Sequence, residues 1–274
     1  ILKIKNLIKN NLFLYNFLIN FRDKLRIIYN QKRRSRFFWD LRRGDSILSL
    51  DYPLSKDSLF FDIGAHVGNF SIQMAEKYDC NILVIASKND HDTSGSIRES
   101  DKVKIFFQDK EGYGNALIEG INNSKTEYSC IINADGSMDP KYLFEMLDKC
   151  KNNDLVFATR YEKPGGGSDD DTIVTLIGNK IFSFLGNFLF DLKISDILYT
   201  YILGKTISFK KMKLESRDFR LCVEIPIKAK KMKLKYLCLP SYERCRIAGV
   251  KKVNAIKDGF LILLGILSFI GKKY

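Results

Sequence analysis

The chain has 274 residues, 45 % of them hydrophobic and 28 % charged, which indicates a folded globular protein and argues against a disordered chain. Its formal net charge of +13 favours anionic partners, and because no DNA- or RNA-binding motif accompanies the charge, phospholipid headgroups and phosphorylated substrates are expected rather than nucleic acid. Six scattered cysteines without Cys-x-x-Cys spacing argue against a disulfide framework or a zinc site and favour a reducing compartment.

The first predicted element is a basic helical arm over residues 1–43. From Leu12 to Ile28 apolar residues recur at intervals of three and four, as on one face of a helix, with Lys and Arg between them. A basic amphipathic helix of this kind is typical of attachment to an anionic membrane surface. The alternative is a packing helix whose charged side is solvated.

A strand, a glycine-rich turn and a helix are predicted next. Ser58 to Asp62 is strand-like, and Asp62–Gly68 reads Asp-Ile-Gly-Ala-His-Val-Gly. Such a turn lets the backbone approach a nucleotide-like ligand at a helix N-terminus. A second strand is predicted over Asn81–Ile85, and Ala86-Ser87 follows it.

An acidic loop after a third strand is the most informative feature of the chain. The apolar run Tyr128–Ile132 leads into Asn133-Ala-Asp135-Gly-Ser-Met-Asp139, and Pro140 is expected to open the next helix. A carboxylate at the C-terminal end of a central strand lies where open α/β sheets bind ligands, and it can reach a divalent cation that holds a diphosphate. The alternative is a strand-to-helix turn with an N-capping side chain.

The second half of the chain continues with alternating strands and helices. It first predicts a buried strand Asp154–Thr159, which ends in Arg160-Tyr161, and a Gly165–Gly167 loop followed by the solvated acidic run Ser168–Asp171. A helix Ile173–Phe190, the pair Ser195-Asp196 and a β-like segment Lys205–Lys211 come next. A helix around Phe219–Lys230, a strand Lys235–Leu239 and the closing segment Arg244–Lys252 complete the order. The apolar stretch Phe260–Gly271 is about twelve residues long, short of the roughly 20 that a spanning helix needs, so an interfacial or core-packing helix is expected.

This order of features resembles the family 2 glycosyltransferases of the GT-A fold, in particular their polyprenyl-phosphate mannose synthase-like branch, over about residues 81–259. The resemblance implies an Mg²⁺ or Mn²⁺ ion on Asp135 and a general base at Asp196. It also implies donor and phosphate contacts from Gly114, Asn115, Asn133, Asp135, Arg160, Arg246 and Lys252.

The chain also departs from that family. The acids expected after the second strand are replaced by Ala86-Ser87, and Asn133 stands where the first aspartate of the metal loop is expected. Over about residues 38–82 the chain instead resembles FkbM-type S-adenosylmethionine-dependent methyltransferases, although the ribose-binding acid after Ile85 is absent. We therefore interpret the chain as a chimera, in which a methyltransferase-like strand and helix replace the transferase's own first unit.

These observations together predict an α/β fold with a mainly parallel Rossmann-like sheet, flanked by helices and preceded by the arm. The expected segments are 1–43, 44–82, 83–258 and an apolar C-terminal helix over 259–274. The leading function is sugar transfer from a nucleotide-sugar to a lipid-linked or polysaccharide acceptor, at the inner face of the cell membrane. The rival interpretations are an FkbM-type methyltransferase acting on a saccharide and an inactive recombined membrane-associated protein.

Overall fold

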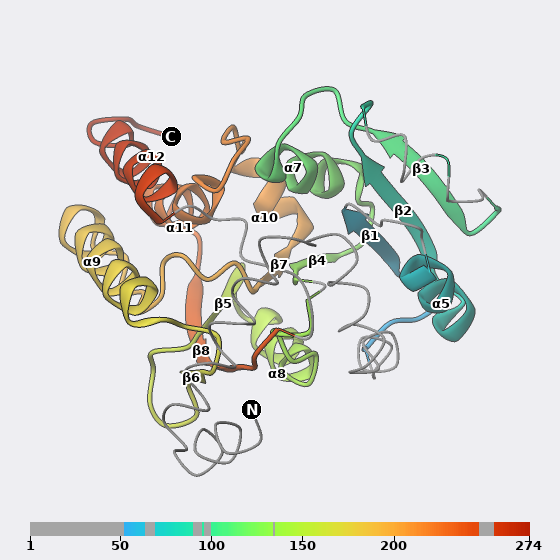
Figure 1. Ribbon diagram of the computed structural model, residues 1–274, viewed down its shortest axis with the longest axis horizontal. Helices are drawn as coiled ribbons and strands as arrows, with labels where there is room; N and C mark the ends of the chain where they lie inside the picture. The colour runs from blue at the N-terminus through green and yellow to red at the C-terminus, as the bar shows by residue number, and fades with distance from the viewer. Residues whose placement is uncertain (1–51, 64–68, 90–94, 96–99, 134, 247–254) are drawn as a thin grey trace, which may run out of the picture.

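The computed structural model describes residues 52–63, 69–89, 95, 100–133, 135–246 and 255–274. Its first half contains a parallel sheet in the order β1-β2-β3 (Figure 1). These strands are β1 (Leu59–Ile63), β2 (Asn81–Ala86) and β3 (Val103–Phe107), and helix α5 (Asn69–Tyr78) connects the first two. The predicted strand and helix on either side of the glycine-rich run are confirmed, while residues 64–68 lie outside the described residues.

A second sheet of four strands carries the remainder of the fold, in the order β4-β7-β5-β8. Its members are β4 (Tyr128–Ile131), β7 (Ile202–Lys205), β5 (Leu155–Thr159) and β8 (Tyr236–Pro240), and the short strands β6 (Gly167–Ser168) and β9 (Tyr242–Glu243) pair in parallel beside it. Strand β7 runs antiparallel to both of its neighbours, whereas β5 and β8 are parallel. The predicted α/β class is confirmed.

Helices cover the second sheet on both sides. They are α7 (Tyr113–Asn123), α8 (Tyr142–Cys150), α9 (Ile173–Phe190), α10 (Thr206–Lys211), α11 (Leu221–Lys231) and α12 (Ala255–Ser268). In Figure 1, α9, α11 and α12 lie together at the edge of the molecule opposite β1–β3. The C-terminal helix begins a few residues earlier than the predicted 259, and the arm over 1–43 lies outside the described residues; the domain boundaries stay a prediction.

Strand β5 shows why this sheet is central. Leu155 and Phe157 belong to the core formed with α11 and α12, whereas Val156 and Ala158 belong to the core formed with α8. Because successive side chains of a strand point to opposite faces, a strand buried on both faces must be apolar throughout. The run Leu-Val-Phe-Ala meets that requirement, and the predicted strand is confirmed to within one residue.

The β-like prediction for Lys205–Lys211 is wrong, because β7 ends at Lys205 and Thr206–Lys211 is the helix α10. A strand would place Ile207 and Phe209 on the same face. In the structure Ile207 is 57 % exposed and Phe209 is 1 % exposed. The helix puts Phe209 into the core and leaves Ile207 outside.

Helix α9 has the predicted bounds, and local chemistry explains both. Thr172 begins it with a capping box, in which its hydroxyl accepts a hydrogen bond from the Thr175 backbone N–H at 3.2 Å. Asp191 ends it in the left-handed conformation. Among the described residues, α9 is the one helix long and apolar enough to cross a membrane by length and composition, with 17 % of it buried.

Candidate functional site

A large pocket of ≈ 940 Å³ lies between the two main sheets. Leu59 of β1 lines it on one side and Tyr128–Ile131 of β4 on the other, while α7 and α9 contribute further walls. Four of the residues predicted for the site line this pocket: Asn133, Asp135, Arg160 and Arg246. The structure therefore brings together side chains that lie up to 113 residues apart in the sequence.

Asp135 is a turn residue that is also accessible from the pocket, and its role as a metal ligand stays a prediction. Its Oδ1 accepts a hydrogen bond from the Ser137 backbone N–H at 3.0 Å, which makes it a turn residue. Gly136 has a φ of 79°, a conformation that favours glycine, so the chain reverses directly after the carboxylate. The Asp135 side chain remains 24 % exposed and lines the pocket, which leaves it accessible to a ligand.

Arg246 joins two carboxylates in the pocket. Its Nε and Nη2 donate to Oδ1 and Oδ2 of Asp170 at 3.2 and 2.7 Å, and its Nη1 lies 3.6 Å from Oδ2 of Asp135. The hydrogen bonds to Asp170 raise the pKa of Arg246 above its ordinary value, so the guanidinium stays charged. A cation thus stands next to the predicted metal ligand.

Arg160 forms a second, more deeply buried cluster. Its Nε and Nη2 donate to Oδ2 and Oδ1 of Asp196 at 2.7 and 2.9 Å, and its Nη1 donates to Oε2 of Glu243 at 2.9 Å. Asp171 lies 3.4 Å from the same Nη1. The Arg160 side chain is 7 % exposed and that of Asp196 is 0 % exposed. Charges this deeply buried persist because they are paired and hydrogen-bonded.

The surroundings of Arg160 explain its electrostatics. Burial alone would lower the pKa of its guanidinium, but the Asp196 carboxylate overrides that effect and raises it. The guanidinium also lies over the ring of Tyr199, 4.6 Å from the centroid. Arg160 therefore orders three carboxylates, whereas the sequence predicted a phosphate contact for it.

The predicted base, Asp196, lies behind Arg160 and is not among the pocket-lining residues. Two other carboxylates of the same cluster, Asp171 and Glu243, do line the pocket. Asp171 accepts a short hydrogen bond from the Tyr161 hydroxyl, 2.5 Å, and Glu243 accepts one from Ser168 at 2.5 Å. The base role of Asp196 stays a prediction, and its accessibility is the property to test.

Gly114 and Asn115 contact another loop of the protein instead of lining the pocket. The Asn115 backbone N–H donates to the carbonyl of Arg217 at 3.1 Å, and its side-chain amide donates to Glu119 at 2.6 Å. A Cβ on Gly114 would lie 2.3 Å from the Ser216 carbonyl oxygen. Their donor contacts stay a prediction, and Lys252 lies outside the described residues.

The acidic run Asp169–Asp171, predicted as solvated, is so only at Asp169, whereas Asp170 and Asp171 are mostly buried. Asp169 accepts from the Tyr242 hydroxyl at 2.5 Å, while Asp170 and Asp171 hold the two arginines. Glu243 was not predicted as a site residue; it follows β8 closely and belongs to the strand pair β6–β9. A carboxylate just after a predicted strand was the signal that would have found it.

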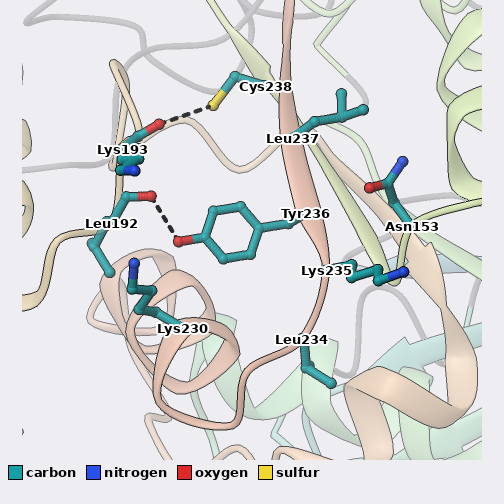
Figure 2. A pocket seen from close by; sticks show the side chains of 9 residues that line it. All are labelled: Asn153, Leu192, Lys193, Lys230, Leu234, Lys235, Tyr236, Leu237 and Cys238. Atoms are coloured by element: carbon teal, nitrogen blue, oxygen red, sulfur yellow. Dashed lines mark hydrogen bonds between the residues drawn. The ribbon is translucent and has the colours of Figure 1, made fainter.

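A second, smaller hollow of ≈ 370 Å³ lies against β8 (Figure 2). The Tyr236 hydroxyl donates to the Leu192 carbonyl at 2.6 Å, and the Cys238 thiol points at the Lys193 carbonyl. Lys193, Lys230 and Lys235 line it. It contains none of the predicted site residues, and the candidate site is the larger pocket.

The described residues define an α/β protein with a carboxylate- and arginine-lined pocket at the ends of its strands. The family model Glycosyl transferase family 2 matches residues 70–212, just over half of the 274 residues. The chain therefore belongs to glycosyl transferase family 2, and by family it is a glycosyltransferase.

Solved structures show the same fold. Glucosyl-3-phosphoglycerate synthase from Mycobacterium tuberculosis, in complex with Mn²⁺, UDP and phosphoglyceric acid, is 10 % identical with a TM-score of 0.56, over 86 % of this chain and 84 % of that chain. The same enzyme in complex with Mg²⁺ and UDP gives a TM-score of 0.54 at 10 % identity, over 86 % and 84 % of the two chains. At this identity the likeness shows the fold alone.

Proposed function

We propose that this protein transfers a sugar from a nucleotide-sugar donor to a lipid-linked or saccharide acceptor, assisted by Mg²⁺ or Mn²⁺. The observation that carries the proposal is the pair Asp135 and Arg246 in the pocket at the end of β4. Membership of glycosyl transferase family 2 supports it, as do the fold neighbours, which are bound to UDP with Mn²⁺ or Mg²⁺.

The residues of the pocket fit a divalent cation that arrives with the donor. Among the described residues, no group of three His, Cys, Asp or Glu side chains forms a metal site on its own. Magnesium is commonly bound by one or two carboxylates together with substrate phosphates, and Asp135 offers one such carboxylate. The cation would supply positive charge that stabilises the departing diphosphate.

The charge of the pocket gives a reason for such a cation. Two guanidinium groups, those of Arg160 and Arg246, hold four carboxylates besides Asp135: those of Asp170, Asp171, Asp196 and Glu243. Among the described residues of the site negative charge is in excess, and it would repel a bare diphosphate. Asp135 would hold the cation, and Arg246 would offer its guanidinium to a phosphate oxygen.

In the proposed reaction the acceptor oxygen attacks the anomeric carbon with inversion, and the bond from that carbon to the diphosphate breaks. The electron pair leaves with the diphosphate, and a carboxylate takes the proton of the acceptor hydroxyl. Asp171 and Glu243 face the pocket, while Asp196 orients Arg160 from behind. In this proposal Arg160 keeps both pocket carboxylates in position.

The finer assignments are part of the same proposal. The resemblance over residues 81–259 supports an acceptor of the polyprenyl-phosphate kind, and the basic arm supports peripheral attachment at the cytoplasmic face of the cell membrane. Both rest on the sequence. The FkbM-type alternative rests on the sequence Asp62–Gly68, of which residues 62 and 63 end β1 and residues 64–68 lie outside the described residues.

Calorimetric titration with UDP and GDP, with and without Mn²⁺, tests the proposal. We expect UDP or GDP to bind only when Mn²⁺ is present. In Asp135→Asn, Mn²⁺ should no longer increase nucleotide binding, because the carboxylate proposed to hold the cation is lost. The matched control is Asp148→Asn, which removes an exposed carboxylate of α8 and leaves binding unchanged.

The same titration includes S-adenosylmethionine, for which we expect no binding. The acid expected after Ile85 is absent, and buried cofactor hydroxyls without partners cost about 1–3 kcal/mol each. Micromolar binding of this cofactor would establish the methyltransferase alternative. If neither nucleotide nor cofactor bound, the inactive recombined protein would be the correct interpretation.

A further inference from the structure

Helix α9 has an exposed apolar stripe, while its fully buried positions hold polar or small residues. Its buried residues are Asn179, Ser183 and Gly186. Six of its large apolar side chains are exposed, and among them Ile173, Phe184 and Phe188 are 77, 66 and 76 % exposed. Phe182, Leu189 and Phe190 instead pack against the core. A helix on the surface of a soluble protein normally buries its apolar stripe and exposes its polar one.

Helix α12 extends the exposed surface. Phe260, Leu264, Leu267 and Ile270, in α12 and just after it, are each at least 44 % exposed. The two helices touch, since a Cβ on Gly259 would lie 3.8 Å from the Phe182 ring of α9. They lie side by side at the edge of the molecule in Figure 1. We call this surface the α9–α12 face; its exposed apolar residues are Ile173, Val174, Ile177, Ile181, Phe184, Phe188, Phe260, Leu264, Leu267 and Ile270.

Basic residues accompany this face. Lys180 is exposed on the outward stripe of α9, Lys257 is exposed near the start of α12, and Lys272 and Lys273 are exposed beyond its end. Aliphatic stems of lysines lie along apolar surface while their ammonium groups reach a polar phase. An apolar stripe flanked by lysines therefore complements an anionic lipid surface.

The same lysines disfavour a second copy of the chain as the partner that covers the α9–α12 face. A two-fold dimer joins identical patches, so it would place the lysines of both copies in or around one interface. An apolar face without an occupant is unusual for a monomer, since such patches mark partner or membrane surfaces. Of these two, an anionic bilayer satisfies both the apolar residues and the lysines.

We propose that the α9–α12 face docks on an anionic lipid bilayer with both helices lying in the headgroup region. Although α9 is long enough to span a bilayer, its Asn179 and Ser183 face is packed against the protein. A helix attached in this way lies in the interface with one apolar face inserted.

The docked orientation connects the membrane with the pocket. Thr175, Asn179 and Phe182 of α9 and Ile262 of α12 line the pocket from the inner sides of the same helices. The pocket wall is therefore one helix thickness from the lipid. Resting on the proposed function, this arrangement makes a lipid-linked acceptor the substrate class within reach of the site.

Vesicle co-sedimentation of the full-length chain tests the docking directly. The vesicles are phosphatidylcholine alone or with phosphatidylglycerol, and the variant is Phe184→Gln with Phe188→Gln. Two aromatic side chains leave the interface, so we expect binding to anionic vesicles to weaken at least about tenfold. Phe144→Gln, at a 56 % exposed phenylalanine of α8, is the matched control and leaves binding unchanged.

A second measurement, tryptophan fluorescence quenching, tests whether the α9–α12 face is inserted into the bilayer. Phe188→Trp in a Trp39→Phe background carries one tryptophan on α9, and brominated lipids quench it if the face is inserted. Strong quenching supports the proposal. Absence of quenching, or equal vesicle binding by the double glutamine variant, overturns it, and so does a dimer that the double variant converts to monomer.

Both readouts are independent of catalysis. Failure of nucleotide to bind would overturn the proposed function and leave the docking standing. Absence of quenching with intact nucleotide binding would overturn the docking and leave the proposed function standing.

Discussion

At the scale of residues, the contacts around Arg160 bear on whether Asp196 acts as a general base or holds Arg160 in position. Its carboxylate is fully buried and takes two side-chain hydrogen bonds and one backbone hydrogen bond from Arg160. A general base must reach the acceptor hydroxyl, either directly or through a water molecule. An Asp196 fixed in this manner acts through the arginine, which in turn holds Asp171 and Glu243.

Asp196→Asn is therefore expected to destabilise the protein, because it leaves a buried guanidinium short of one counter-charge. Breaking a buried ion pair typically costs about 3–5 kcal/mol. Urea unfolding followed by circular dichroism measures this change. Asp148→Asn, at an exposed pair with Lys151, is the control and should change stability by less than about 1 kcal/mol. Lost transferase activity with unchanged stability would instead support the base predicted from the sequence.

At the scale of elements, the start of α7 packs against the segment Ser216–Asp218. Gly114 makes this approach possible, because a Cβ there would lie 2.3 Å from the Ser216 carbonyl oxygen and 2.7 Å from that of Asp218. Both atoms belong to the backbone and cannot swing away as a side chain would. A glycine that resembles a donor-binding residue in the sequence thus has a packing reason to be there.

Gly114→Ala should reduce stability by about 1–3 kcal/mol, the usual range for overpacking. Gly178→Ala is the matched control, because a Cβ on that helical glycine meets nothing within 4 Å. Alanine is favoured over glycine in a helix interior by about 1 kcal/mol, so the control should be neutral or slightly stabilising. Thermal unfolding of the two variants makes the comparison, and equal melting temperatures would show that the 216–218 segment moves aside.

The elements also show how far the sequence predicts the fold. Strand β5 and helix α9 followed from apolar runs and boundary residues that act locally. Residues 205–211 did not, because Ile207 and Phe209 alternate as in a strand, and only the tertiary core selects Phe209 for burial.

The candidate site was likewise predictable from the sequence only in part. Asp135 was predictable because it directly follows a strand. Arg246 was predicted only from the family resemblance. Its pairing with Asp135 and the partners of Arg160 were not predicted, because side-chain pairing across 11 to 111 residues leaves no local pattern.

At the scale of the whole molecule, the predicted arm and the proposed α9–α12 docking face would make different kinds of membrane contact. The arm over residues 1–43 lies outside the described residues and carries the clustered charge of Lys32–Arg36. The α9–α12 face contributes mainly apolar area. Charge interactions at a membrane contribute about 1 kcal/mol per basic residue and are screened by salt, whereas apolar insertion is not.

This difference predicts two phases of release from anionic vesicles. Changing Lys32, Arg33, Arg34 and Arg36 to Gln in the full-length chain should weaken binding strongly at about 50 mM salt and hardly at about 500 mM, where the Debye length is only a few ångströms. Phe184→Gln with Phe188→Gln should weaken binding at both concentrations. Co-sedimentation of wild type and both variants at the two salt concentrations measures this pattern. If the arm variant bound as well as wild type at low salt, the membrane affinity would belong to the α9–α12 face alone; if wild type were fully released at high salt, it would belong to the arm.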